Sequence, residues 1–284
     1  MTLYISDLDG TLLRDDATLS PHSRRELVSF IREGVPITIA SARSICSIRP
    51  ILGDIPFRLP IIEINGAFIT DYPTGRKQII HDLDGERARR AFETILASGS
   101  RPFISGNGKA GDFLYFKDIV NPGMEAYVAE RRRTGDKRLR KVEDLRAALE
   151  IPGNRITCIS VIDSAERIME LTGEIRGQSS DSFVSTEFEY RENPGWYFLT
   201  LHDRLATKDN AIRYLRSAWG FEEAELVVFG DDVNDEGMLR LADLGVAPSN
   251  AKAGIKAAAG KIIGSNQDDS VVRYIRSRVG PPKQ

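Results

Sequence analysis

Short apolar runs alternate with amphipathic segments in the first third of the chain. Strands are expected at residues 3–6, 35–40 and 60–64, with helices at 20–33 and 44–52 between them. Runs that are apolar almost throughout are typical of parallel strands buried on both faces. The order strand, helix, strand, helix, strand therefore predicts part of a parallel α/β sheet.

The last third repeats this pattern. Helices are expected at 208–219 and 235–241, and strands at 226–229 and 245–247. A parallel sheet with helices on both faces accommodates both ends of the chain. The expected fold class is therefore α/β, with a Rossmann-like doubly wound sheet as its core.

The middle of the chain has a different pattern, in which the expected helices and strands do not alternate regularly. This region predicts an inserted α+β domain over residues 83–201, so that residues 1–82 and 202–284 form the core domain. Helices are expected at 85–97, 122–133 and 165–175, and strands at 113–116, 156–162, 183–187 and 196–201.

Composition excludes several classes of protein. The 284 residues include 39 basic and 41 acidic side chains, so a net charge of -2 gives no general attraction to nucleic acid or anionic membranes. Cys46 and Cys158 are far apart and indicate neither a disulfide framework nor a zinc site. The sequence shows neither a signal peptide nor a membrane span, and we expect a soluble cytoplasmic protein.

Two carboxylates follow the first strand. Asp7 and Asp9 are two residues apart, so in an extended chain both can face one site, and Gly10 permits a sharp turn behind them. Their mutual repulsion requires a divalent cation, a shared proton or a basic side chain between them. The simpler alternative is a turn that ends the strand, because Asp and Gly are common turn residues.

A second acidic cluster, Gly230 to Asp235, follows the strand at 226–229. Ligands of open α/β sheets gather beyond the carboxyl ends of the strands, where Asp231 would meet Asp7 and Asp9. A site with only oxygen ligands favours Mg2+, which commonly shares its ligands with a phosphate. Helix N-capping explains some of these acids but not all of them.

Two further segments complement the acids. Ser41, Ala42 and Arg43 follow the second strand and offer a hydroxyl and backbone N–H groups for an anion. Lys208 lies in the first turn of its helix, where the helix dipole disfavours a cation. Taken singly, Ser41 is better explained as a helix cap and Arg43 as a surface cation. The alternative for Lys208 is a position on a solvated helix face.

Together these segments resemble, in order and context, the four motifs of the haloacid dehalogenase superfamily. The motifs are Asp7 to Leu12, Ser41, Lys208, and Gly230 to Asp235. The large insert between the second and third motifs is similar to the cap of the Cof-type class IIB branch of phosphatases. Weaker similarities to that branch are Asn65-Gly66-Ala67, Gly245-Val246-Ala247 with Asn250-Ala251, and Ser265-Asn266 before a terminal helix.

The chain departs from the family pattern at three places. Ala42 stands where a glycine is usual, Asp209 replaces the glycine that usually follows the lysine, and Pro248-Ser249 replaces a common Met-Gly. None of these changes removes a catalytic side chain. They put in doubt the shape of the phosphate pocket, and Asp209 adds a negative charge beside Lys208.

The resemblance implies a mechanism with an aspartyl-phosphate intermediate. Asp7 would be the nucleophile and Asp9 the general acid and base. Mg2+ would be held by Asp7, the backbone carbonyl of Asp9 and Asp231. Ser41 and Lys208 would bind the phosphoryl oxygens. Supporting positions, either around the metal or in the phosphate and substrate loops, would be Asn234, Asp235, Gly10, Ala42, Arg43 and Asn65, with Asp232 a lesser candidate.

The leading functional reading is an Mg2+-dependent phosphatase acting on a small phosphorylated metabolite such as a sugar phosphate. A cap of this size would close over the site and exclude large substrates. A phosphotransferase or phosphomutase with the same intermediate is the alternative. A binding module that has lost turnover is disfavoured, because no nucleophile or metal acid is missing. The oligomeric state stays open.

Nucleic-acid binding is the least favoured reading. It would rest on a basic run without interleaved aromatic residues, a pattern more typical of a solvated loop. Near the return crossing from the insert, Arg191, Trp196 and His202 are conceivable substrate contacts, but each is expected to be structural. The basic run comprises Arg131, Arg132, Arg133, Lys137, Arg138, Arg140 and Lys141.

Overall fold

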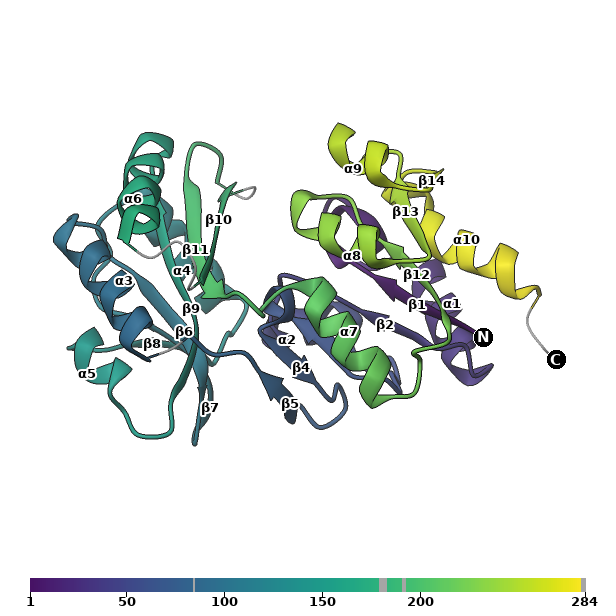
Figure 1. The fold of residues 1–284 in the computed structure, drawn as a ribbon, viewed down its shortest axis with the longest axis horizontal. Helices are drawn as coiled ribbons and strands as arrows, with labels where there is room; N and C mark the ends of the chain where they lie inside the picture. Colours follow the sequence, from purple (N-terminus) through teal and green to yellow (C-terminus); the bar gives the residue numbers. More distant parts are fainter. Residues whose placement is uncertain (84, 179–182, 191–192, 282–284) are drawn as a thin grey trace. The chain divides into compact units, whose positions relative to one another are not determined.

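The computed structural model describes residues 1–83, 85–178, 183–190 and 193–281. The chain forms two compact units, one from Met1–Ile79 with Leu205–Gln284 and the other from Ile80–Arg204 (Figure 1). The bounds expected from the sequence differ from these by three residues at each junction. The roles of the two units as catalytic core and specificity domain stay predictions.

The first unit is built on a parallel sheet, in which every recorded strand pair is parallel. β1 lies between β2 and β12, so strands from the two ends of the chain are neighbours. The strand order is β14 (Lys261–Ile263), β13 (Leu244–Pro248), β12 (Glu225–Phe229), β1 (Thr2–Ser6) and β2 (Ile37–Ile39).

Helices cover both faces of this sheet, because side chains that alternate along β1 feed two separate cores. Tyr4 packs with one group of helices, and Leu3 and Ile5 pack with the other. The expected doubly wound α/β fold is thereby confirmed. The first group is α1 (Pro21–Arg32), α2 (Ile45–Leu52) and α10 (Ser270–Val279); the second is α7 (Lys208–Ala218), α8 (Glu236–Leu241) and α9 (Ala253–Ala258).

A small sheet extends this unit through β3 (Ile61–Glu63), β4 (Phe68–Thr70) and β5 (Lys77–Ile80). Only β3 was expected from the sequence. The turn between β3 and β4 contains Ile64, Asn65 and Gly66, all with positive φ values of 49°, 53° and 101°. A β-branched residue rarely adopts this conformation, so the surrounding contacts must hold the turn in place.

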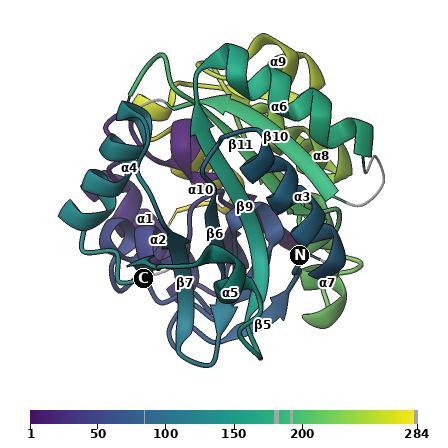
Figure 2. The ribbon, with the colours of Figure 1, turned by 90° about the vertical axis from the view of Figure 1, so that its left-hand side faces the viewer.

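The second unit has a six-stranded sheet with helices on both faces (Figure 2). Its strand pairs are antiparallel except for β7 with β8. The order is β10 (Phe183–Glu189), β11 (Tyr197–Asp203), β9 (Arg155–Asp163), β6 (Phe103–Gly108), β7 (Gly111–Phe116) and β8 (Leu139–Lys141). One face packs against α3 (Gly85–Ala97), α5 (Leu145–Leu149) and α6 (Ala165–Gln178), and the other against α4 (Pro122–Arg133).

Three residues of the second unit were weighed as substrate contacts. His202 is buried, and its Nδ1 lies 3.2 Å from the carbonyl oxygen of Thr157. Trp196 packs on the apolar cluster around α4. Both positions agree with a structural role, whereas Arg191 lies outside the described residues.

The basic run is partly neutralised within its own loop. Arg138 forms two hydrogen bonds with the carboxylate of Asp136, at 2.9 and 2.6 Å. Arg131 lies 3.9 Å from the same carboxylate and stacks over the ring of Tyr127. These contacts give two of the basic side chains a local structural role. Within the described residues, no helix is both long and apolar enough to span a bilayer.

Candidate active site

Two neighbouring strands bring the first and second acidic clusters together. Ser6 at the end of β1 is opposite Phe229 at the end of β12, and the Asp7 amide donates a 2.9 Å hydrogen bond to the Phe229 carbonyl. β2, the next strand in the sequence, lies on one side of β1, and β12, β13 and β14 from the end of the chain lie on the other side. This is the kind of position where open α/β sheets bind their ligands.

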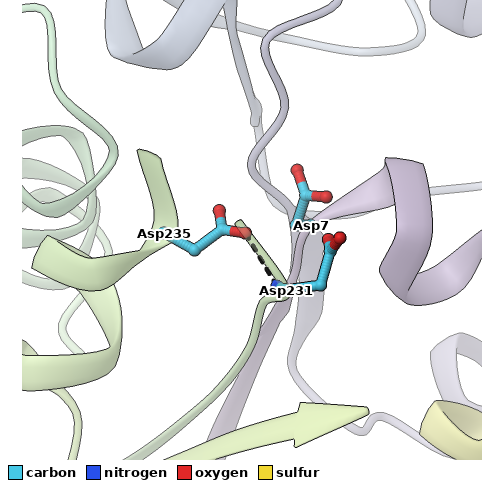
Figure 3. Close-up of side chains that lie close together, drawn as sticks. All are labelled: Asp7, Asp231 and Asp235. Carbon is cyan, nitrogen blue, oxygen red and sulfur yellow. Dashed lines mark hydrogen bonds between the residues drawn. The ribbon is translucent and has the colours of Figure 1, made fainter. Parts of the chain in front are cut away.

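Three buried carboxylates converge beyond these strand ends (Figure 3). Asp7, Asp231 and Asp235 each offer one oxygen atom, and these oxygens lie within 4.8 Å of one another. Their convergence was expected for Asp7 and Asp231, whereas Asp235 was expected only in a supporting position. We call these three residues the acid group.

Lys208 is the cation of this group. Its Nζ lies 2.6 Å from Oδ1 of Asp7 and 2.6 Å from Oδ1 of Asp235, and its side chain is only 1% exposed. Burial lowers the pKa of Lys208, but the carboxylates of Asp235 and Asp7 outweigh that effect and raise it above its ordinary value. The amine is therefore a permanent positive charge.

One ammonium does not neutralise three buried carboxylates. Burial raises the pKa of Asp7 well above its ordinary value; Lys208 opposes this shift, whereas Asp235, Asp9 and Asp231 add to it. A divalent cation among the same oxygens would remove this excess of negative charge. The donor set, composed of carboxylate oxygens, fits a hard cation.

Asp231 is oriented by the loop that follows Asp7. The hydroxyl of Thr11 donates a 2.8 Å hydrogen bond to Oδ1 of Asp231. Gly10 has a φ of +74°, and a Cβ added there would lie 2.3 Å from Oδ2 of Asp231. Glycine is therefore required at this position by both its backbone conformation and its neighbour.

Asp235 is held by donors on both carboxylate oxygens. Oδ2 accepts from the backbone amides of Asp231 (2.9 Å) and Asp232 (3.1 Å), and Oδ1 accepts from Lys208. These bonds suit a residue that orients the acid group. Asp232 lies further out, where its side chain caps the following turn and pairs with Lys252 at 2.6 Å.

Asp9 is paired with Arg43 rather than with the acid group. Nε and Nη2 of Arg43 donate to the two carboxylate oxygens of Asp9 at 2.7 and 2.8 Å. Arg43 was predicted only as part of a phosphate loop, and its partner was not identified. The contact arises because β1 and β2 are adjacent, so the segments after them meet.

Ser41 is fully buried, and its Oγ accepts a 3.1 Å hydrogen bond from the amide of Arg43. Among the hydrogen bonds of the described residues, none joins this hydroxyl to Asp7 or Lys208. Ala42 is exposed. Its exposure leaves the backbone of this loop accessible to a ligand.

Asn65 joins the site through Asn234, whose amide nitrogen lies 3.0 Å from the Asn65 side-chain oxygen. Asp209, the departure beside Lys208, lies 4.0 Å from the guanidinium of Arg213 one turn later. Its carboxylate also borders Gly237 of α8, where an added Cβ would lie 2.9 Å away. Asp209 therefore has partners of its own.

Sequence reasoning missed Thr11 and Asn250 as contributors. Asn250 donates a 2.8 Å hydrogen bond to the Gly10 carbonyl and so supports the loop after Asp7. Thr11 could have been found from its place in the first motif. Apart from its resemblance to a family turn, nothing in the sequence around Asn250 indicated this contact, because Gly10 lies 240 residues away.

Comparison with known proteins gives one consistent result. A family model described as haloacid dehalogenase-like hydrolase matches residues 4–275. A pyridoxal phosphate phosphatase of Escherichia coli is 25% identical over 287 residues, covering 96% of this chain and 97% of its own. A phosphoglycolate phosphatase of Methanopyrus kandleri is 24% identical over 280 residues, covering 97% and 96%.

Solved structures agree with this result. A Thermotoga maritima protein matches with a TM-score of 0.78 and 26% identity, covering 99% of this chain and 98% of its own. A sugar phosphatase of haloacid dehalogenase subclass IIB shares the fold, with a TM-score of 0.78, 19% identity and coverage of 98% and 99%. The resemblance to the haloacid dehalogenase superfamily that was found in the sequence is confirmed. The chain belongs to the haloacid dehalogenase-like hydrolases.

Proposed function

We propose that the protein is an Mg2+-dependent phosphatase that hydrolyses a small phosphorylated metabolite through an aspartyl-phosphate. The observation that carries this proposal is the buried contact of Lys208 with Asp7 inside the acid group. In this proposal the Asp7 carboxylate is the nucleophile, and the ammonium of Lys208 beside it binds a phosphoryl oxygen. Relatives named for the hydrolysis of phosphoglycolate and pyridoxal phosphate support a small phosphomonoester as substrate.

Asp7, the backbone carbonyl of Asp9, and Asp231 would hold Mg2+, with Asp235 and Asn234 orienting the ligands. When bound, the ion supplies positive charge that suppresses the repulsion between carboxylate and phosphate. The acid group fits this role because its carboxylates exceed the one buried ammonium beside them.

The remaining steps use the side chains of the chain itself. Asp7 attacks phosphorus, the bond to the leaving oxygen breaks, and Asp9 donates a proton to that oxygen. Asp9 then takes a proton from the water that hydrolyses the aspartyl-phosphate. Lys208 and Ser41 bind phosphoryl oxygens and stabilise their charge. Arg43 orients Asp9 through its two hydrogen bonds.

The unit Ile80–Arg204 is proposed to select the leaving group, because the motif residues of the reaction all lie in the other unit. A phosphotransferase or phosphomutase would use the same residues up to the aspartyl-phosphate and would then transfer the phosphoryl group to an alcohol. The identity of the acceptor separates the two functions.

The experiment is a phosphate-release screen across sugar phosphates, nucleotides and cofactor phosphates, with Mg2+ and with a chelator. We expect release from small phosphomonoesters only with Mg2+, and none by Asp7→Asn at unchanged circular dichroism. Full turnover by Asp7→Asn would refute the nucleophile. Transfer to an added sugar without phosphate release would favour the phosphotransferase.

A further inference from the structure

A fourth buried carboxylate lies outside the acid group. Glu63 ends β3, has 0% exposure, and has no part in the mechanism above. Its carboxylate accepts hydrogen bonds from the Ile45 amide (2.5 Å), the Thr70 hydroxyl (2.5 Å) and the ammonium of Lys77. The Lys77 side chain is itself only 7% exposed, so this is a buried ion pair with added hydrogen bonds.

Glu63 caps a helix from outside that helix. Ser44 occupies the N-cap position of α2, but its side chain makes no capping bond. The Ser44 hydroxyl is buried and has no hydrogen-bond partner within the described residues. Glu63 accepts from the amide of Ile45, the first residue of the helix, and its negative charge complements the helix dipole.

The backbone around Glu63 holds the loop that precedes α2. The Ser41 amide donates to Ile62 (2.9 Å), and the amides of Ile64 and Asn65 donate to the carbonyls of Arg43 (3.1 Å) and Ser41 (3.0 Å). The bond from the Ile45 amide to Glu63 continues this series of hydrogen bonds to the point where the loop ends and α2 begins. The segment that carries Ser41 and Arg43 is therefore fixed along its whole length.

A local capping hydroxyl would satisfy an amide of the first turn at lower cost, because a buried ion pair must overcome the desolvation of two charges. The bond to Glu63 ties the start of α2 to β3 and so fixes the position of the helix relative to the sheet. A cap within the helix itself would not fix that position. Arg43 lies two residues before Ile45 and forms two bonds with Asp9, so its reach depends on that position.

We propose that Glu63 is a positioning residue for the reaction, whose carboxylate fixes the start of α2 so that Ser41 and Arg43 stand where the phosphoryl group and Asp9 require them. This inference rests on the proposed phosphatase function. Neither the charge nor the hydrogen bonds of Glu63 reach the substrate directly.

The test compares two double variants with wild type. Glu63→Ala with Lys77→Met removes the ion pair without leaving a buried charge unpaired. Glu63→Gln with Lys77→Met keeps an oxygen that accepts from the Ile45 amide. We expect kcat/KM to fall at least about tenfold in the first and to stay within about threefold of wild type in the second.

Glu33→Ala is the matched control. It removes a partly buried carboxylate, 12% exposed, that pairs with Arg276 in the same unit, away from the acid group. We expect a lower melting temperature and a kcat/KM within about twofold of wild type. In a Ser41→Ala background the loss caused by the Ala and Met pair should shrink, because both changes act on one group.

The proposal is wrong if the Ala and Met pair keeps wild-type kcat/KM, or if its loss is equally large in the Ser41→Ala background. Calorimetric binding of inorganic phosphate in MgCl2 gives a readout without turnover, and the affinity should weaken in the Ala pair but not in the Gln pair. A wild-type protein that binds phosphate but hydrolyses no ester would refute the phosphatase and leave this test in force.

Discussion

Lys208 and Asp7 are 201 residues apart in sequence, yet the ammonium of one lies 2.6 Å from the carboxylate of the other. The same ammonium also donates a 2.6 Å hydrogen bond to the carboxylate of Asp235. Removal of Lys208 therefore acts on two carboxylates at once, and this contact leads to the first prediction.

Lys208→Met should lower kcat/KM by about a hundredfold or more, because the phosphoryl oxygens lose their buried cation. It should also destabilise the fold by about 3–5 kcal/mol, since buried carboxylates are left without their partner. Added Mg2+ should raise the melting temperature of this variant more than that of wild type. Arg276→Met, which breaks partly buried pairs with Glu26 and Glu33, should show no such dependence on Mg2+.

Gly10→Ala should abolish metal-dependent activity. Its Cβ would collide with the Asp231 carboxylate, and its backbone φ of +74° is unfavourable for alanine. Gly34→Ala is the matched control, because Gly34 has a φ of +80° and nothing within 4 Å of its added Cβ. Gly34→Ala should cost about 1 kcal/mol of stability and no activity. Equal losses of Mg2+ affinity in both variants, measured by calorimetry, would contradict the contact with Asp231.

Arg43→Lys should lower kcat by about tenfold or more, although the charge is kept. Lysine cannot reproduce two parallel hydrogen bonds to the Asp9 carboxylate, so Asp9 loses its orientation. Steady-state kinetics on a generic phosphomonoester would measure the effect. An unchanged kcat would show that Asp9 needs no such partner.

His202 should make the second unit sensitive to acid. Burial lowers its pKa from the ordinary 6.5 to about 4, while its hydrogen bond with the Thr157 carbonyl opposes the shift. Between these values the unfolded chain binds the proton more tightly, so stability falls as the pH falls from about 6.5 to 4, by about 3 kcal/mol in total. Below pH 4 this contribution changes no further.

His202→Asn removes the titrating group and keeps a donor for Thr157. Denaturant unfolding between pH 4 and 7 should show a shallower loss of stability for this variant than for wild type. Parallel slopes would mean that His202 is protonated equally in the folded and unfolded chain.

The core sheet and the acid group were predictable because their signals are local. A buried strand that ends in Asp7, and another that ends before Asp231, can be read from short runs of residues. The α/β pattern predicts that both strands belong to one parallel sheet. That β1 and β12 are direct neighbours is seen only in the structure.

Other elements had no local signal. β6 contains Ser105, Gly106, Asn107 and Gly108, which read as a loop, yet pairing with β7 and β9 makes them a strand. β4, β8 and β14 are only three residues long; β2 and β3 are equally short, but they lie within the longer, mostly apolar runs at 35–40 and 60–64 that made them predictable. The role of Glu63 was hidden for a different reason, because its partners are brought to it by β4, β5 and α2 together.

The pairing of β1 with β12 also has a consequence for synthesis of the chain. β1 leaves the ribosome long before the strand that covers one of its edges, because that strand begins only at Glu225. Until then that edge is open to pairing with other chains. The nascent chain therefore carries Asp7 long before Lys208, Asp231 and Asp235, and the acid group cannot assemble until all of these residues have been synthesised.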